Sequence, residues 1–386
     1  VSPRRFLMND LVRDLAPPAP SPDYDAALAR LQDPSTGVRI AHIDAGVAPH
    51  LTFGDADALP PNILVDEGRN FFDPKPEDHR PIASLKLSGR VTFSKLEFPD
   101  HGVKTLSAIL GVTDHLKGVA PGAPIVPYRI ANGPLFIRSS GAGPFMQESE
   151  TERLGDAIEH LMSLDPVPRV VSISMGNPAT SGLWDILRIL AGGESGLARR
   201  TKRLIRKAYE RGIIVVCAAG QVIDTVVLPA RMPETIAVGG FDRQGGKLDH
   251  YPPNGYMIPA LVDVWAQAER INRATYDLNR PSRPQIFAED EAAKGDPSGT
   301  SYACPQVAAA AALWCALHRE ALDRADYLEQ PWRAVEAFRF ALRESAREER
   351  ATLAGPDREQ VWIKSLDIPR LLVLPPVVPG DCVRVG

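Results

Sequence analysis

Gly299-Thr300-Ser301-Tyr302-Ala303-Cys304-Pro305 is followed directly by an alanine-rich apolar run, residues 306–314. Proline is tolerated in the first turn of a helix, where its missing N–H would have no intrahelical partner. The pattern therefore predicts a loop that enters a buried helix, with Pro305 in the first turn and the Ser301 hydroxyl at the positive end. The positive end of a helix stabilises negative charge, so it suits a nucleophile whose reaction passes through a negatively charged transition state. The alternative is that Ser301 only caps the helix.

Upstream of this stretch, continuous apolar runs alternate with amphipathic helical patterns. Unbroken apolar strands that alternate with helices are typical of a parallel sheet covered on both faces. The sequence therefore predicts an α/β fold with a mostly parallel central sheet and helices on both faces. The expected strands are 38–43, 125–130, 170–174, 213–218, 235–238 and 261–265, and the expected helices include 24–31, 101–110, 198–210 and 332–347.

The 386 residues are compatible with one large domain. Residues 1–36 are interpreted as an N-terminal extension that wraps the domain, residues 37–375 as the domain itself, and residues 376–386 as a C-terminal tail. Within the domain, residues from about 51 to 99 are loop-rich, with weak strand patterns near Asn70 and Val91, and residues from about 267 to 297 are polar and lack a clear period. They are interpreted as surface insertions.

Composition excludes several classes of partner. A net charge of −4 without a dominant basic stripe argues against nucleic acid. No apolar stretch approaches the roughly 20 residues of a membrane span. The four cysteines show no metal-ligand spacing.

The cellular location is only weakly indicated. There is no signal peptide in this chain, and thiol usage slightly favours the cytoplasm over secretion. The first residue, Val1, leaves a processed form open.

Two further positions, Asp44 and His101, hold side chains of the types that catalyse proton transfer. Asp44 follows the expected strand 38–43, and the carboxyl ends of strands are where open α/β sheets place ligands and reactive groups. His101 stands in the first turn of an expected helix, where the helix dipole disfavours a cationic imidazolium. Each residue also has an ordinary interpretation, Asp44 as a turn residue and His101 as a packing residue.

Taken together, Asp44, His101 and Ser301 are the parts of a Ser-His-Asp triad in the chain order Asp, His, Ser. A serine hydroxyl is a weak nucleophile unless a base accepts its proton, and that base needs a carboxylate to fix its tautomer. An esterase of the α/β-hydrolase type is excluded, because that fold requires the order Ser, acid, His.

These motifs resemble those of the subtilisin-like serine peptidases, the subtilase family. The resemblance rests on Ile43-Asp44-Ala45-Gly46-Val47, Asp100-His101-Gly102 and the stretch from Gly299 to Ala308. It extends over about residues 24–374, interrupted by the two insertions. It implies the subtilisin-like three-layer fold and the hydrolysis of protein or peptide substrates by an endopeptidase.

By this resemblance Ser301 is the nucleophile, His101 the general base and Asp44 the carboxylate that orients it. It also implies that catalysis requires no cofactor, while a structural calcium site is left open. His50 resembles a structural histidine of the family and is not counted as catalytic. The substrate-binding backbone and pocket walls are expected at Ser174, Met175 and Gly176 on one side and at Ala218, Ala219 and Gly220 on the other.

Gln221 is the main departure from the family pattern, which usually has Asn after Ala-Ala-Gly to donate to the oxyanion. Gln retains the amide but adds a methylene, and a misplacement of about 1 Å can cost on the order of 10²-fold in rate. Ala45 also replaces the usual Ser or Thr. Gln221 and the long insertions motivate an alternative, a subtilase-fold binding or regulatory module with weak or no turnover. Fewer residues precede Asp44 than an inhibitory propeptide needs, so a removed propeptide or a regulatory partner is expected.

Overall fold

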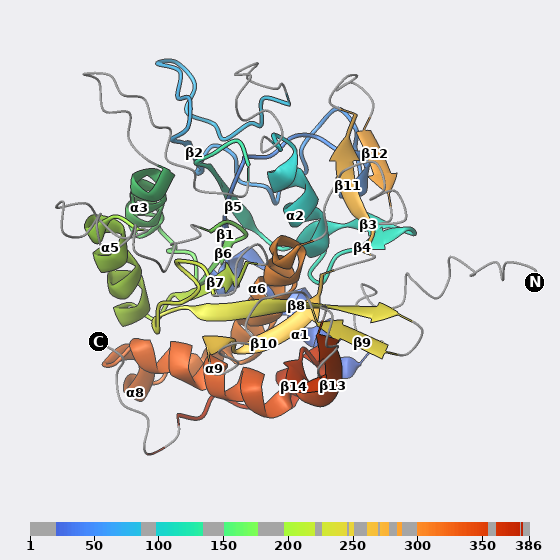
Figure 1. Ribbon diagram of the computed structural model, residues 1–386. Coiled ribbons are helices and arrows are strands. Elements are labelled where there is room, and N and C mark those ends of the chain that lie inside the picture. The colour runs from blue at the N-terminus through green and yellow to red at the C-terminus, as the bar shows by residue number, and fades with distance from the viewer. Residues whose placement is uncertain are drawn as a thin grey trace, which may run out of the picture.

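A computed structural model of the chain describes most of its length (Figure 1). The described residues are 21–85, 98–133, 150–176, 197–220, 226–244, 247–250, 261–268, 271–277, 284–287, 299–353, 360–378 and 380.

The main sheet has ten strands in its described part, and one half of it is entirely parallel. β1 lies in the middle of this half, between β5 and β6, with its residues buried. The parallel strands, in spatial order, are β2 (Arg69–Asn70), β5 (Ile125–Arg129), β1 (Ile40–Asp44), β6 (Val170–Ile173), β7 (Ile214–Ala218) and β8 (Ile236–Gln244).

The other half of the sheet closes on itself. β8 pairs with both β9 and β10, and the remaining two strands complete the ring. These strands are β9 (Lys247–His250), β10 (Val264–Gln267), β13 (Arg347–Leu353) and β14 (Gln360–Ser365). Two small antiparallel sheets stand apart: β3 (Val112–Thr113) with β4 (Leu116–Lys117), and β11 (Arg273–Tyr276) with β12 (Pro284–Phe287).

Helices cover both faces of the parallel strands (Figure 1). Alternate strand residues point to opposite faces, so two separate cores form. α3 (Glu150–Leu161) and α5 (Arg199–Glu210) pack on one face. The other core contains α1 (Pro22–Gln32), α2 (His101–Leu110), α6 (Thr300–Leu317), α9 (Trp332–Ser345) and α10 (Ile368–Val373), and the short helices α7 (Arg319–Leu322) and α8 (Ala325–Leu328) follow α6. The prediction of a mostly parallel sheet between two helical layers is confirmed.

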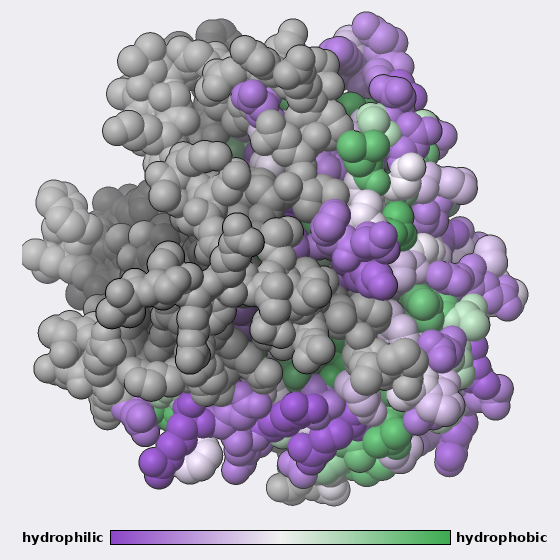
Figure 2. Space-filling model, turned by 90° about the vertical axis from the view of Figure 1, so that its right-hand side faces the viewer, coloured by the Kyte–Doolittle hydropathy of each residue, from purple (hydrophilic) through white to green (hydrophobic). Residues whose placement is uncertain are grey.

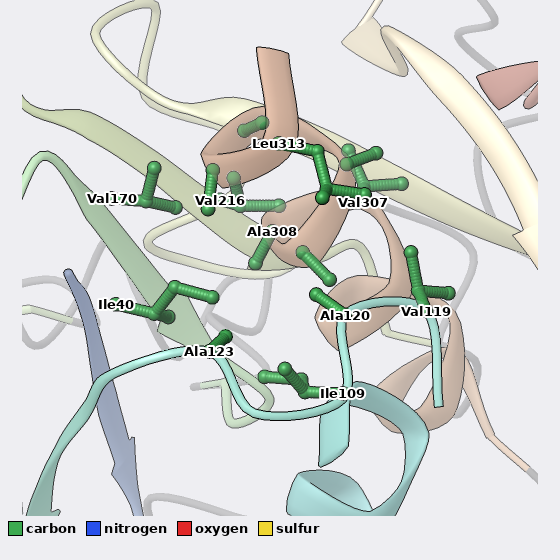
Figure 3. Packing of buried hydrophobic residues seen from close by; sticks show 14 of the residues in the cluster. Ile40, Ile109, Val119, Ala120, Ala123, Val170, Val216, Val307, Ala308 and Leu313 are labelled. Atoms are coloured by element: carbon green, nitrogen blue, oxygen red, sulfur yellow. The ribbon is translucent and has the colours of Figure 1, made fainter. Parts of the chain in front are cut away.

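α6 is the central helix of the larger core. Figure 3 shows Val307, Ala308 and Leu313 of this helix in one cluster with Ile40 and Val216 of the sheet. Five consecutive alanines, residues 308–312, are fully buried, and their small side chains allow α6 to pack closely on all sides. The start of α6 is thereby fixed against the carboxyl ends of the central strands.

Most expected elements are found with boundaries shifted by one or two residues. The N-terminal helix α1 belongs to the larger core, where Tyr24 donates from its hydroxyl to the Val119 carbonyl at 2.9 Å. The expected helix 332–347 ends at Ser345, because Arg347 already pairs in β13. The chain from Gln360 onward adds the strand β14 and the helix α10 to the elements expected from the sequence. The domain boundaries themselves stay a prediction.

Within the described part of the chain, no helix combines the length and the apolar character that crossing a membrane requires. On the face shown in Figure 2, hydrophilic side chains predominate among the described residues, with hydrophobic ones interspersed.

Candidate active site

A close approach of two backbone segments places Asp44 and His101 next to each other. Asp44 is the last residue of β1 and is fully buried. α2 begins at His101 and packs directly against the turn after β1. This close packing is possible because Gly102 has no side chain. A Cβ at Gly102 would lie 2.1 Å from the Gly46 carbonyl oxygen, so only glycine permits this approach.

His101 and Asp44 form a buried hydrogen-bonded pair. The His101 Nδ1 lies 2.7 Å from the Asp44 Oδ1, which also accepts from the Ala45 N–H at 2.7 Å. The Thr105 hydroxyl donates to the Asp44 Oδ2 at 3.0 Å. With its Nδ1–H donated to the carboxylate, a neutral His101 has its lone pair on Nε2, as a general base requires.

The carboxylate of Asp44 stays ionised in spite of its burial. Burial alone would raise the pKa of Asp44, but the charge of His101, the hydrogen bond to His101 and the hydrogen bond from the Ala45 N–H outweigh it. The pKa of Asp44 is therefore held below its usual value. A fixed negative charge thus lies behind His101 at neutral pH.

Ser301 is the second residue of α6 and does not cap it. The N-cap is Gly299, in an extended conformation, and no side chain caps this helix end. The Ser301 hydroxyl instead donates across to the Ser174 carbonyl at 2.9 Å, at the end of β6, and not to His101. The capping interpretation is therefore wrong. Catalytic hydrogen bonds are often long or poorly aligned in a free enzyme and tighten when substrate binds.

Pro305 lies farther into the helix than the sequence suggests. It is an interior residue of α6, in the second turn, so the prediction of a first-turn proline is wrong. Any other residue at this position would donate its backbone N–H to the carbonyl four residues earlier, that of Ser301, and proline has no N–H to donate. The helix therefore lacks one backbone hydrogen bond at the residue that carries the candidate nucleophile.

The loop after β7 is tied to the start of α6. Gly220 has a φ of +89° and donates its N–H to the Thr300 hydroxyl at 3.0 Å. Ala218 and Ala219 precede it and are buried. The expected oxyanion residue, Gln221, lies outside the described residues.

The two expected pocket walls face a side chain of the protein itself. A Cβ at Gly176 would lie 2.3 Å from the Val227 Cγ2, and one at Gly220 would lie 2.7 Å from the Val227 Cγ1. Val227 also donates its N–H to the Ala219 carbonyl at 2.9 Å. Both walls therefore touch Val227, which takes part of the space between them. Met175 is buried beside Ser174, which receives the Ser301 hydroxyl.

Cys304, three residues after Ser301, is not an alternative nucleophile. Its side chain is fully buried, and its sulfur lies 3.4 Å from the Val216 carbonyl oxygen. Burial raises the pKa of the Cys304 thiol to about 12. The thiolate that a nucleophile needs is therefore not formed near neutral pH.

The second expected insertion is anchored to the start of α2. Asp100, which precedes His101, accepts from the Thr275 hydroxyl at 2.7 Å and from the Tyr276 N–H at 3.2 Å. It also forms an ion pair with Lys104 at 3.2 Å. β11 is buried along its length, so the interpretation of this stretch as surface is wrong for Arg273–Tyr276. His50 reaches the same strand, with its Nε2 3.1 Å from the Thr275 carbonyl oxygen.

Two residues that lie beside Asp44, Thr105 and His42, are not part of the sequence motifs. Thr105 stands four residues after His101 on α2, and His42 stands two residues before Asp44 on β1. Residues at these spacings share one face of a helix and one face of a strand. The helical and strand periods could therefore have identified both. No cluster of metal-ligating side chains occurs among the described residues, and calcium stays a prediction.

Comparison with known proteins identifies the family. The family model described as the subtilase family matches residues 35–362. The prenylagaramide maturation protease PagA is similar in structure, with a TM-score of 0.54, 18% identity, and coverage of 91% of this chain and 98% of PagA. A protease from Pseudoalteromonas arctica is also similar, with a TM-score of 0.61, 18% identity, and coverage of 94% and 96%. No curated protein matches the sequence significantly. The family match covers most of the chain, which therefore belongs to the subtilases.

Proposed function

We propose that this subtilase is an active serine endopeptidase, with Ser301 as nucleophile, His101 as general base and Asp44 as its orienting carboxylate. The observation that supports this proposal best is the buried 2.7 Å contact between His101 and Asp44. A packing histidine has no need of a buried, ionised carboxylate that accepts three hydrogen bonds.

In the proposed reaction, the His101 Nε2 accepts the Ser301 proton while the Ser301 oxygen attacks the peptide carbonyl carbon. The tetrahedral intermediate collapses when His101 returns that proton to the departing amine, and the acyl-enzyme remains. Water then attacks the acyl carbon in the same way, with His101 as the base, and the carboxylic acid product leaves from Ser301. The Ser301 N–H and the Gln221 amide are proposed as donors to the oxyanion.

An extended peptide is the proposed substrate, bound along the backbone of Ser174, Met175 and Gly176. The Ser174 carbonyl is held by the Ser301 hydroxyl before substrate binds. If a substrate N–H takes over this carbonyl, the hydroxyl is released to turn towards His101. Binding of the peptide and activation of the nucleophile would then be coupled through one oxygen atom. A propeptide or a regulatory partner is a further proposal.

A fluorophosphonate probe tests this function, because it forms a stable adduct only with an activated serine. The protein is incubated with an alkyl fluorophosphonate, and the adduct is located by peptide mass spectrometry. We expect stoichiometric labelling at Ser301 and none in the folded Ser301→Ala variant. Folded wild-type protein that takes up no label would exclude the peptidase and leave the binding or regulatory module, which Gln221 motivates.

The Gln221→Asn variant is expected to raise kcat. The shorter side chain would return the amide to the length that the family uses, and an optimally placed oxyanion donor contributes about 10²- to 10³-fold. We expect an increase of up to about tenfold, since the longer amide already supplies part of that effect. Steady-state hydrolysis of a fluorogenic peptide measures it. A drop in kcat would mean that the surrounding loop is built for Gln.

A further inference from the structure

A second buried network lies behind the Asp44–His101 pair, and the proposed reaction does not use it. It consists of His42, from β1, and Thr105, from α2. Both side chains are fully buried, although both are polar. A buried polar group is costly unless it is hydrogen-bonded, so their contacts indicate what they do.

The Thr105 hydroxyl has four polar atoms within hydrogen-bond distance but only one proton to donate. Its oxygen lies 3.0 Å from the Asp44 Oδ2, 3.1 Å from the His42 Nε2, 3.1 Å from the His101 carbonyl oxygen and 3.2 Å from that of Gly102. The single hydroxyl proton is held most strongly by the charged acceptor, which is the carboxylate. The Thr105 oxygen is then an acceptor towards His42.

His42 can serve as that donor only in one state. Its Nε2 faces the Thr105 oxygen and the Gly102 carbonyl, while its Nδ1 is buried with no hydrogen-bond partner among the described residues. Burial lowers the pKa of His42, so the ring is neutral and carries one proton. That proton belongs on Nε2, where both neighbours accept, because a proton on Nδ1 would have no acceptor.

The ordinary interpretation of Thr105 is a helical threonine that donates back to the carbonyl of the preceding turn. That interpretation leaves the Asp44 Oδ2 without the donor that faces it. A carboxylate held at only one oxygen can turn about its last bond and draw His101 with it. The Ala45 side chain offers no hydroxyl to replace Thr105.

We propose that Thr105 is a positioning residue for the reaction, which holds the Asp44 carboxylate through its second oxygen, and that His42 fixes the Thr105 hydroxyl. This inference rests on the proposed peptidase function. Thr105 acts on the reaction through Asp44 and His101 and does not touch the substrate.

Inactivation kinetics with the alkyl fluorophosphonate test this inference. Thr105→Val removes the hydroxyl at nearly constant volume, and kinact is expected to fall about 10- to 100-fold, the loss expected for one hydrogen bond to a charged group. KI should stay within about twofold, because no contact of Thr105 with the probe is removed. Thr105→Ser retains the hydroxyl and should recover most of the rate. Thr201→Val is the matched control, since Thr201 is a buried threonine of α5 whose hydroxyl donates to the Thr151 carbonyl of α3. These two helices pack on the opposite face of the sheet from α2.

His42→Val should slow inactivation by about 3- to 10-fold, the effect of losing a neutral hydrogen bond. The double variant His42→Val/Thr105→Val should be no more than about twofold slower than Thr105→Val alone, because both changes act through one hydroxyl. Thermal unfolding of each variant confirms that it is folded. If Thr105→Val does not fold, Thr105→Ala against Thr105→Ser makes the same comparison.

The outcomes separate the two proposals. Wild-type protein that is not labelled would overturn the peptidase function and this inference with it. Labelled wild type with an unchanged kinact in folded Thr105→Val would overturn the inference alone. A Thr105→Ser variant as slow as Thr105→Val would overturn it too, because the shape of the side chain and not its hydroxyl would then matter.

Discussion

His101→Ala is expected to lower kcat for a peptide substrate by about 10⁴- to 10⁶-fold, with little change in KM. Without a base, the Ser301 proton has no acceptor as the oxygen attacks, and the leaving amine receives no proton. The oxyanion donors and substrate binding would remain and sustain a small residual rate. Because the ring contacts Asp44 and not the expected substrate backbone, kcat should carry nearly the whole loss.

The matched control for this variant is His115→Ala. His115 is exposed in the turn between β3 and β4, and the hydrogen bond shown for it uses its backbone carbonyl. Its replacement should leave kcat unchanged. Both variants are compared with wild type by peptide hydrolysis, with thermal unfolding as the measure of folding. A folded His101→Ala protein that keeps more than about one hundredth of the wild-type kcat would rule out His101 as the general base.

The fold could be predicted in large part because its signals are local. The apolar strands at the centre of the sheet and the helix that starts at His101 follow from patterns within ten or twelve consecutive residues. Buried parallel strands are apolar on both faces, and their short length separates them from the much longer apolar run of α6. The ring formed by β8, β9, β10, β13 and β14 has no comparable signal, since its closure depends on the pairings β8–β10, β10–β14 and β9–β13, which join residues far apart in the chain.

The candidate site could be predicted only as far as its motifs reach. Asp44 and His101 follow from strand and helix boundaries, and the structure brings their side chains together. The anchoring of β11 by Asp100 depends on a contact across 175 residues, which no local pattern contains. Pro305 lies in the second turn and not the first because the helix begins at Thr300, with Gly299 as N-cap, and the sequence does not mark this start.

Asp44→Ala is expected to lower kcat by about 10⁴-fold, the loss found when the carboxylate of such a triad is removed. Its effect differs from that of His101→Ala because the base is still present. Without the carboxylate, His101 is free to turn and to place its proton on either nitrogen. The positive charge that forms on the ring during the reaction would also lose its partner in a buried site.

Asp44→Asn should be milder than Asp44→Ala by roughly tenfold, about the value of one retained hydrogen bond. The Oδ1 position receives both the Ala45 N–H and the His101 Nδ1–H, so the asparagine oxygen is expected there. Its NH₂ group would then face Thr105, whose hydroxyl can turn to the His101 carbonyl, 3.1 Å away. This arrangement keeps the His101 tautomer and loses only the charge.

Steady-state kinetics of the two Asp44 variants on one peptide distinguish orientation from charge. The same order, Asn above Ala, should appear in kcat while KM is unchanged, since neither variant alters the expected substrate backbone. If Asp44→Asn were as slow as Asp44→Ala, the asparagine NH₂ would be facing His101 and imposing the wrong tautomer. The hydrogen bond from Ala45 would then not control the orientation of residue 44, and the Oδ1 contacts would not be what holds His101 ready for catalysis.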